Sequence, residues 1–204
     1  MKLLIATGNP GKIREFREML GQDRFEWSDL AANPNPPTVE ETGRTFRANA
    51  CLKASFYARD FNTWAVADDS GLEVDALGGS PGVLSARWAE HHQSGKGDAD
   101  NNALLLKQLA GVPDEKRTAR FICVLALSDP AGRIVVSVRD TVEGRVIHNP
   151  RGRNGFGYDP LFLIDALLNT TAELPPEEKH AISHRGKALR RLRALMDELP
   201  LPQR

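Results

Sequence analysis

The chain has 204 residues, of which 41% are hydrophobic and 26% are charged, a composition typical of a globular protein with a buried core. Its 27 Lys and Arg residues equal its 27 Asp and Glu residues, so the formal net charge is zero and long-range attraction to nucleic acid or a membrane surface is not expected. The length predicts either one domain with a full core or one domain with two lobes.

The chain opens with a short apolar strand over 3–6, which turns through Thr7-Gly8-Asn9-Pro10-Gly11-Lys12 into a helix. Backbone N–H groups, the positive end of the helix dipole and the Lys12 ammonium would converge there, so the segment predicts a cradle for several phosphates. The spacing of its glycines is too short for a P-loop, and Ile13 stands where a P-loop needs Ser or Thr, which excludes a Walker-type nucleotidase. The alternative is an ordinary strand–helix turn with a surface lysine.

Apolar residues at helical spacing follow this turn, and Gly21 is expected to end the first helix. A second strand over 25–30 leads into a proline-rich loop over 31–38. A helix is then expected from about Thr45 to Arg59.

An apolar strand over 64–67 runs directly into Asp68-Asp69-Ser70-Gly71 and is expected to end there. The later predicted elements are a turn over 78–82, a helix over 98–109, hairpin strands over 120–127 and 134–141, a continuation over 144–147, a loop over 149–158, a strand over 161–164 and a last helix from about Ser183. Alternating strands and helices with one antiparallel hairpin predict an α/β fold, in which helices pack on a mixed sheet.

The two cysteines, Cys51 and Cys123, form no CxxC pair and match no zinc spacing. They are expected to be buried free thiols in a reducing compartment, and therefore in the cytoplasm. The first apolar run stops after Ala6, too short for a signal peptide, and the longest apolar stretch, 121–127, is too short to span a membrane.

Two pairs of adjacent carboxylates stand out: Glu40-Glu41 ahead of a helix, and Asp68-Asp69 at the expected end of a strand. Adjacent carboxylates repel, so a pair that lines a cleft requires a cation, an arginine or a shared proton. Beside a phosphate cradle Mg²⁺ meets that need, because it takes one or two carboxylates together with water and phosphate oxygens. A carboxylate there would also deprotonate an attacking water. The alternative is that each pair marks a solvated turn.

A third segment, Gly155-Phe156-Gly157-Tyr158-Asp159-Pro160, places an aromatic ring between two glycines. The glycines would let a flat base approach Phe156 closely and stack on it, and Asp159 could accept hydrogen bonds from the edge of that base. The alternative is an aromatic residue that fills the core beside a turn.

The segment 178–186 contains Ser183, which is expected to be the N-cap of the last helix. The N–H groups behind that cap, together with His184 and Arg185, would point toward an anion or a carbonyl, and Lys179 adds a donor. The alternative is a capped amphipathic helix whose later basic residues form a solvated face.

Motifs along nearly the whole chain, from Leu3 to about Leu195, follow one another in a familiar order. They are Thr7 to Lys12, Glu40-Glu41-Thr42-Gly43, Phe46 with Asn49-Ala50, Ala67 to Leu72, Leu77 to Gly82, Ser85-Ala86-Arg87, Gly155 to Pro160 and Ile182 to Gly186. This order closely resembles the inosine/xanthosine triphosphate pyrophosphatases, which remove deaminated purines from the nucleotide pool.

The resemblance implies Mg²⁺-dependent hydrolysis of ITP, dITP and XTP to the monophosphate and pyrophosphate. It also implies a single domain over 1–204 with an elongated mixed sheet flanked by helices, two lobes with a central cleft, and a homodimer. Asn154, His180 and the segment from His91 to Asp100 depart from the family pattern, which leaves loop details open but not the chemistry.

Carried onto this chain, the family's roles fall on residues already singled out and on Lys53 and Ser70. The resemblance implies that phosphates are held by Thr7, Gly8, Asn9, Pro10, Gly11, Lys12 and Lys53, with Ser70 nearby. It implies that Asp69 accepts the proton and binds the metal, supported by Glu40 (or its neighbour Glu41) and Asp68. It implies that the base is bound by Phe156, Gly157, Tyr158, Asp159, Lys179, His184 and Arg185.

Three alternatives remain. A regulator that binds purine triphosphates without hydrolysing them would use the same cradle and base pocket, but would have no use for the acidic pairs. A pyrophosphatase for other modified nucleotides is the close alternative among enzymes. A nucleic-acid binder that uses the basic last helix is disfavoured by the zero net charge.

Overall fold

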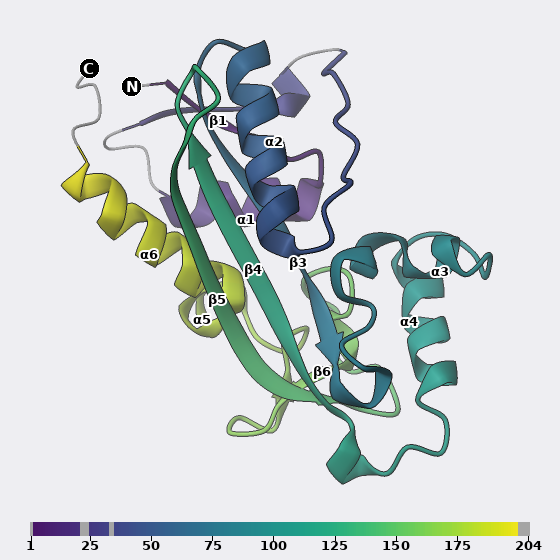
Figure 1. The fold of residues 1–204 in the computed structure, drawn as a ribbon. Coiled ribbons are helices and arrows are strands. Elements are labelled where there is room, and N and C mark those ends of the chain that lie inside the picture. The colour runs from purple at the N-terminus through teal and green to yellow at the C-terminus, as the bar shows by residue number, and fades with distance from the viewer. Residues whose placement is uncertain (1, 21–24, 33–34, 200–204) are drawn as a thin grey trace. The chain divides into compact units, whose positions relative to one another are not determined.

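The structure, a computed structural model, describes residues 2–20, 25–32 and 35–199 (Figure 1). The chain divides into two compact units. The first comprises Met1–Asp69, Cys123–Asp140 and Arg185–Arg204, and the second comprises Ser70–Ile122 and Thr141–His184. The single domain over 1–204 expected from the sequence stays a prediction.

The strands form one seven-stranded sheet in the order β2-β1-β3-β4-β5-β6-β7. Their bounds are β1 Lys2–Ile5, β2 Glu26–Asp29, β3 Trp64–Val74, β4 Thr118–Ser128, β5 Ile134–Val146, β6 Phe162–Ile164 and β7 Asn169–Thr170. Strand β1 pairs in parallel with β2 and β3, whereas β6 pairs antiparallel with β5 and β7. The predicted mixed sheet is therefore confirmed.

In the first unit, helices α1 (Pro10–Leu20) and α6 (His184–Glu198) pack on one side of the strands and α2 (Phe46–Asp60) on the other (Figure 1). Side chains of alternate strand residues, such as Val66 and Leu125, join Phe16 of α1 and Leu192 of α6 in one buried cluster. Two helices therefore pack on the same apolar face of the sheet.

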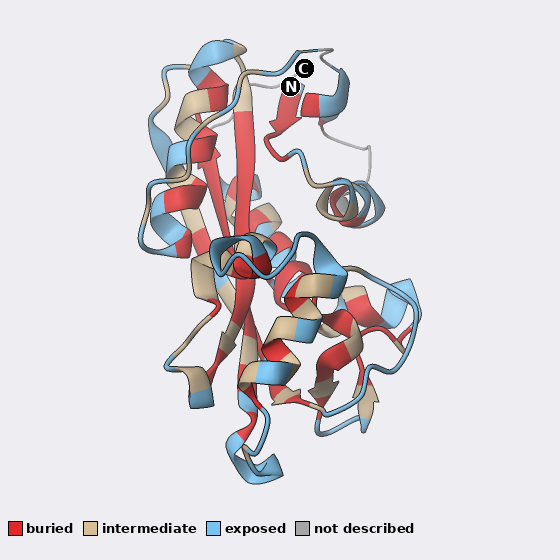
Figure 2. Cartoon of the chain, turned by 90° about the vertical axis from the view of Figure 1, so that its right-hand side faces the viewer, coloured by how far each residue is buried: buried red, intermediate tan, exposed pale blue. Residues whose placement is uncertain are grey.

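In the second unit, helices α4 (Asp98–Gln108) and α5 (Pro176–Ile182) border a separate apolar cluster that includes Leu105 and Phe162, and α3 (Trp88–His91) contacts α4. Arg117 is 1% exposed, and its guanidinium donates to the carbonyls of Leu109 and Val146 at 2.9 and 2.7 Å. This one side chain ties the end of α4 to the end of β5. Figure 2 shows the strands as mostly buried, with exposed residues on the outer faces of the helices and in loops.

The helix predicted over about 45–59 is confirmed: it begins after Thr45, whose side chain accepts from the N–H of Ala48 at 3.1 Å. The last helix begins at His184, after Ser183 with an extended backbone, as an N-cap residue has. The predicted helix end at Gly21 and part of the predicted loop, residues 33–34, lie outside the described residues.

One prediction about β3 is wrong. The strand does not end at Asp68-Asp69 but continues through both aspartates to Val74. Two consecutive buried carboxylates inside a strand are tolerated because each has cationic partners, described below. The short helices α3 and α5 and the strand β7 were also not expected. Among the described residues, no helix is both long and apolar enough to cross a membrane.

Candidate functional site

The predicted phosphate cradle lies between β1 and α1. Asn9 is the N-cap of α1, because its Oδ1 accepts from the N–H of Lys12 at 3.0 Å. The hydroxyl of Thr7 accepts from the N–H of Asn9 at 3.2 Å and so closes the turn. A side chain added at Gly8 would meet no atom within 4 Å, so the turn faces open space on that side. A closed turn at the start of an eleven-residue helix is suited to an anion.

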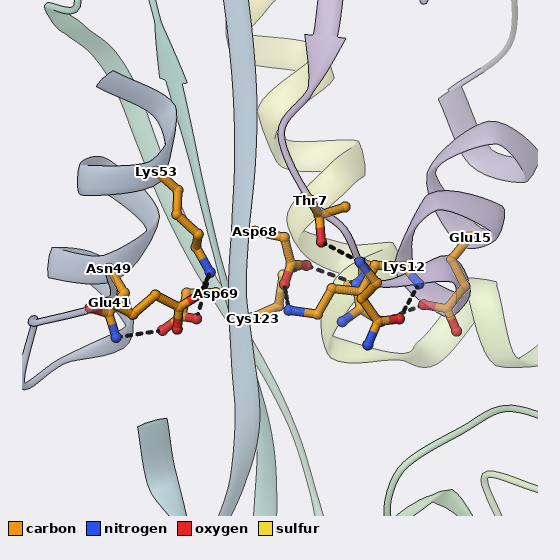
Figure 3. Close-up of polar contacts among 11 residues, drawn as sticks. Thr7, Lys12, Glu15, Glu41, Asn49, Lys53, Asp68, Asp69 and Cys123 are labelled. Atoms are coloured by element: carbon orange, nitrogen blue, oxygen red, sulfur yellow. Dashed lines mark hydrogen bonds and ion pairs between the residues drawn. The ribbon is translucent and has the colours of Figure 1, made fainter. Parts of the chain in front are cut away.

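Asp68 lies at the centre of a buried ionic cluster on the α1 side of β3 (Figure 3). Lys12 Nζ lies 2.5 Å from its Oδ1 and Arg185 Nε lies 2.8 Å from its Oδ2. Arg185 also binds Glu15, and the thiol of Cys123 donates to Asp68 Oδ2 at 3.3 Å. Burial alone would raise the pKa of Asp68, but the charges of Arg185 and Lys12 hold that pKa well below its usual value. Asp68 is thus ionised at neutral pH.

Asp69 extends to the other face of β3, toward α2 (Figure 3). Lys53 Nζ donates to its Oδ1 at 2.9 Å, and Asn49 Nδ2 donates to its Oδ2 at 3.3 Å. Burial raises the pKa of Asp69, and the charges of Lys53 and Lys12 only partly offset that effect. Lys12 therefore lies close enough to act on both aspartates. A carboxylate whose pKa is raised is a stronger base than an ordinary carboxylate and therefore a better proton acceptor.

Glu41 shares the Lys53 ammonium with Asp69, at 2.8 Å from Nζ. Mg²⁺ in proteins commonly binds one or two carboxylates and completes its coordination shell with water and phosphate oxygens. Two carboxylates this close to one cation are therefore suitable Mg²⁺ ligands. Glu41 is half-buried whereas Glu40 is exposed, so the geometry favours Glu41 over Glu40 as the partner of Asp69. Within the part of the chain that the structure describes, no three His, Cys, Asp or Glu side chains form a metal-binding group by themselves.

Sequence reasoning gave Asn49 no role, although it belongs to the site. The side chain is fully buried, and its Oδ1 accepts from the N–H of Gly43 at 2.7 Å while its Nδ2 reaches Asp69. A Cβ at Gly43 would stand 2.4 Å from that Oδ1, so only glycine lets the loop that carries Glu41 approach so closely. The available signal was an amide on the buried face of the helix, one turn before Lys53.

The second unit holds most of the residues predicted to bind the base. Phe156 is half-buried, and Lys179 Nζ lies over its ring at 5.2 Å from the centroid. The Asp159 carboxylate accepts from Lys179 Nζ at 2.7 Å, from the N–H of Phe156 at 2.9 Å and from Thr171 Oγ1 at 2.8 Å. Asp159 was predicted to accept from the base, but its two oxygens already bind these three donors. Its position therefore favours a role in holding the loop.

Tyr158 is buried, and its hydroxyl donates to the carbonyl of Ser85 at 2.9 Å. The imidazole of His184 stacks on Phe121, with ring centroids 4.9 Å apart. Arg185, predicted to bind the base, lies in the first unit. Its guanidinium donates to the carboxylates of Asp68 and Glu15. Ser70, predicted to lie near the phosphates, directly follows Asp69 on β3 and is half-buried.

The chain is similar to known proteins along nearly its whole length. The family model described as the Ham1 family matches residues 3–195. A protein of Exiguobacterium sp. named dITP/XTP pyrophosphatase is 52% identical, covering 95% of this chain and 96% of its own. One of the same name from Bacillus subtilis is 45% identical, covering 95% and 96%.

Solved structures are also similar. A HAM1 protein from Coxiella burnetii has a TM-score of 0.85 at 37% identity, covering 98% of this chain and 100% of its own. A nucleoside-triphosphatase or dITP/XTP pyrophosphatase from Mycobacterium abscessus has a TM-score of 0.73 at 46% identity, with the same coverage. The expected family is thereby confirmed: this chain belongs to the Ham1 family.

Proposed function

We propose that this protein hydrolyses deaminated purine nucleoside triphosphates, namely ITP, dITP and XTP, to the monophosphate and pyrophosphate. The observation that carries the proposal is Asp69, a buried carboxylate of raised pKa held between Lys53 and Asn49 and influenced by Lys12 of the anion-binding turn. A protein that only bound nucleotides would have no use for such a base. The names of relatives at 45 to 52% identity support the same activity.

The triphosphate is assigned to the turn 7–12, to Lys53 and to Ser70. N–H groups at the start of α1 supply fixed donors for phosphate oxygens, and Lys12 supplies a charge at the same end of the helix. Lys53 Nζ donates to the carboxylates of Glu41 and Asp69 in this structure. With substrate bound, it would also donate to a phosphate oxygen while keeping Asp69 in place. Positioning and charge stabilisation are most of what phosphoryl transfer requires.

In the proposed reaction, water attacks the α-phosphorus. A new P–O bond forms to the water oxygen, the bond to the pyrophosphate oxygen breaks, and Asp69 accepts the proton of the water. Asp69 and Glu41, or its neighbour Glu40, would hold Mg²⁺, which when bound neutralises phosphate charge and lowers the pKa of water. Asp68 stays ionised and keeps Lys12 directed toward the turn.

The base is assigned to the loop of Phe156, Gly157 and Tyr158, with Phe156 as the stacking surface. Asp159 and Lys179 hold that loop, and His184 is a further candidate donor to the base. Hypoxanthine and xanthine carry a carbonyl at C6, which a backbone N–H can bind, whereas adenine carries a donor there. A mismatch of buried polar groups discriminates by roughly 10⁴ or more.

Arg185 remains a candidate for the C6 carbonyl only if its guanidinium leaves Asp68 and Glu15. Because that exchange would leave two buried carboxylates with fewer partners, we favour a backbone N–H as the donor. We further propose a homodimer, to be checked by light scattering. A cytoplasmic location is also proposed, in keeping with two free cysteines and a substrate drawn from the nucleotide pool.

The test is pyrophosphate release from ITP, XTP, dITP, GTP, ATP and dTTP, each with and without Mg²⁺. We expect turnover of the first three in the presence of Mg²⁺, and little turnover of GTP, ATP or dTTP. Tight binding of ITP without pyrophosphate release would instead indicate a regulator. Preferred turnover of dTTP would indicate a pyrophosphatase for other nucleotides.

A further inference from the structure

We propose that Asp98 and Asn102 of α4 are positioning residues for the base loop, defined here as Gly155 to Tyr158. They set how tightly and how selectively a purine base is held. The inference rests on the proposed function, since it assigns both residues to the base subsite of that reaction. Neither residue belongs to the motifs from which the family resemblance was drawn.

Helix α4 binds both of the peptide groups that flank Gly157. Asp98 Oδ2 accepts from the N–H of Gly157 at 2.7 Å, and Asn102 Nδ2 donates to the carbonyl of Gly157 at 2.9 Å. Residues four apart lie on the same face of a helix, so one face of α4 binds both polar backbone groups of a single glycine. All three residues belong to the second unit.

The backbone of this glycine needs such support. Gly157 has a φ of +62°, and a Cβ there would meet no atom within 4 Å, so side-chain packing does not fix its conformation. Glycine visits many backbone conformations at little cost. The two hydrogen bonds from α4 select one of them and fix the orientation of the peptide groups on both sides of Gly157.

The same contacts fix the backbone from which the Phe156 ring extends. The N–H of Phe156 is bound by Asp159 Oδ2 at 2.9 Å, and the next N–H along the chain is the one bound by Asp98. Both peptide groups that flank Phe156 are therefore fixed by carboxylates. A ring on a fixed backbone can reach fewer positions before a base binds, which reduces the entropy lost on stacking.

The side chain of Asn102 includes one destabilising feature, and its hydrogen bond to Gly157 explains why an amide stands here nevertheless. Its Oδ1 is buried and has no hydrogen-bond partner among the described residues. A buried polar atom without a partner destabilises the folded state, and an apolar side chain at this position would avoid that penalty. The donor that Asn102 gives to Gly157 is the reason for an amide here.

The experiment compares Asp98→Ala and Asn102→Ala with the parent enzyme, using ITP, XTP and GTP as substrates and inorganic tripolyphosphate as an inhibitor without a base. Losing one hydrogen bond to the loop should raise KM for ITP by about 3- to 10-fold. We expect kcat to stay within about 2-fold and the preference for ITP over GTP to fall. The inhibition constant of tripolyphosphate should not change.

Two variants serve as controls. Asp98→Asn keeps an acceptor for the N–H of Gly157 and should restore the parent KM. Asp100→Ala removes the same charge from the same turn of α4. Because the Asp100 carboxylate accepts from the N–H of Lys96 and not from the loop, this variant should leave KM for ITP unchanged. In a Phe156→Ala background, the further effect of Asp98→Ala should largely vanish, because both changes act on the same ring.

The outcomes are distinguishable. If the parent enzyme hydrolyses none of the nucleotides, the proposed function fails. If the parent is active but Asp98→Ala and Asn102→Ala leave KM and selectivity unchanged, this inference alone is overturned. It is also overturned if tripolyphosphate inhibition weakens in parallel with KM. Should Asn102→Ala fail to fold, Asp98→Ala carries the test, since Asp98 is exposed.

Discussion

Asp68 and Asp69 are consecutive residues of β3, yet their carboxylates lie on opposite faces of the strand and bind different lysines. Lys12 Nζ is 2.5 Å from Asp68, whereas Lys53 Nζ is 2.9 Å from Asp69. The pKa of Asp68 is held well below its usual value by Arg185 and Lys12, and that of Asp69 is raised by burial. One pair of aspartates thus combines a carboxylate of lowered pKa with one of raised pKa.

Replacing Asp69 with Asn should abolish turnover, because the amide cannot accept the proton of the attacking water. We expect kcat to fall by about 10³-fold or more, with nucleotide affinity within a few-fold of the parent. Asp165→Asn is the matched control, since Asp165 is an exposed partner of Arg145. Pyrophosphate release and equilibrium binding of ITP are the measurements. Retained activity would show that Asp69 is not the base.

Replacing Asp68 with Asn should instead lower the free energy of unfolding. Arg185 would remain buried and would keep its contact with Glu15 but lose the one with Asp68, and breaking a buried ion pair typically costs about 3–5 kcal/mol. Urea unfolding followed by circular dichroism at neutral pH measures this change, and Asp165→Asn should alter it by less than about 1 kcal/mol.

The pH dependence gives that prediction a second check. The pKa of Asp68 is lowered in the folded state, so its contribution to stability is fully present above its ordinary value of 3.8. The difference in stability between the parent and Asp68→Asn should shrink as the pH falls below that value. A difference that persisted unchanged in acid would contradict the role of the Asp68 charge.

The parts of this site that depend on neighbouring residues in the sequence could be predicted, whereas those that depend on distant partners could not. The turn 7–12 and the helix after Thr45 follow from capping residues and hydrophobic spacing, and both were expected. The ion pairs of Arg185 were not predicted, because its partners, Glu15 and Asp68, lie 170 and 117 residues away in the chain. The end of β3 was misplaced for a related reason, since cations from three distant segments neutralise its aspartates.

Replacing Asn49 with Asp should move the acidic limb of kcat/KM to higher pH. The variant keeps an acceptor for the N–H of Gly43 but loses the donor to Asp69 Oδ2 and adds a like charge beside it. Both effects disfavour the ionised form of Asp69, whose pKa burial already raises. Loss of one charge-assisted hydrogen bond corresponds to a shift of about 1 to 2 pH units.

The control for that shift is Asn62→Asp, the same change at an exposed turn residue that follows α2. Its pH profile should match that of the parent. An unshifted acidic limb in Asn49→Asp, with the variant folded and active, would mean either that Asn49 does not act on Asp69 or that another group titrates in this limb. Asp69→Asn, if it keeps residual activity, separates these two readings, because its profile should lack the limb that belongs to Asp69.

Replacing Phe156 with Ala should weaken nucleotide binding through the base alone. Stacking of a base on an aromatic ring contributes about 1–3 kcal/mol, so KM for ITP should rise by roughly 5- to 150-fold. Inhibition by inorganic tripolyphosphate should be unaffected, because that ligand has no base. Leu168→Ala, which removes an exposed apolar side chain of the same unit, is the control. An unchanged KM in Phe156→Ala would remove the ring from the base subsite, and a weaker response to tripolyphosphate would mean that the substitution disturbs more than stacking.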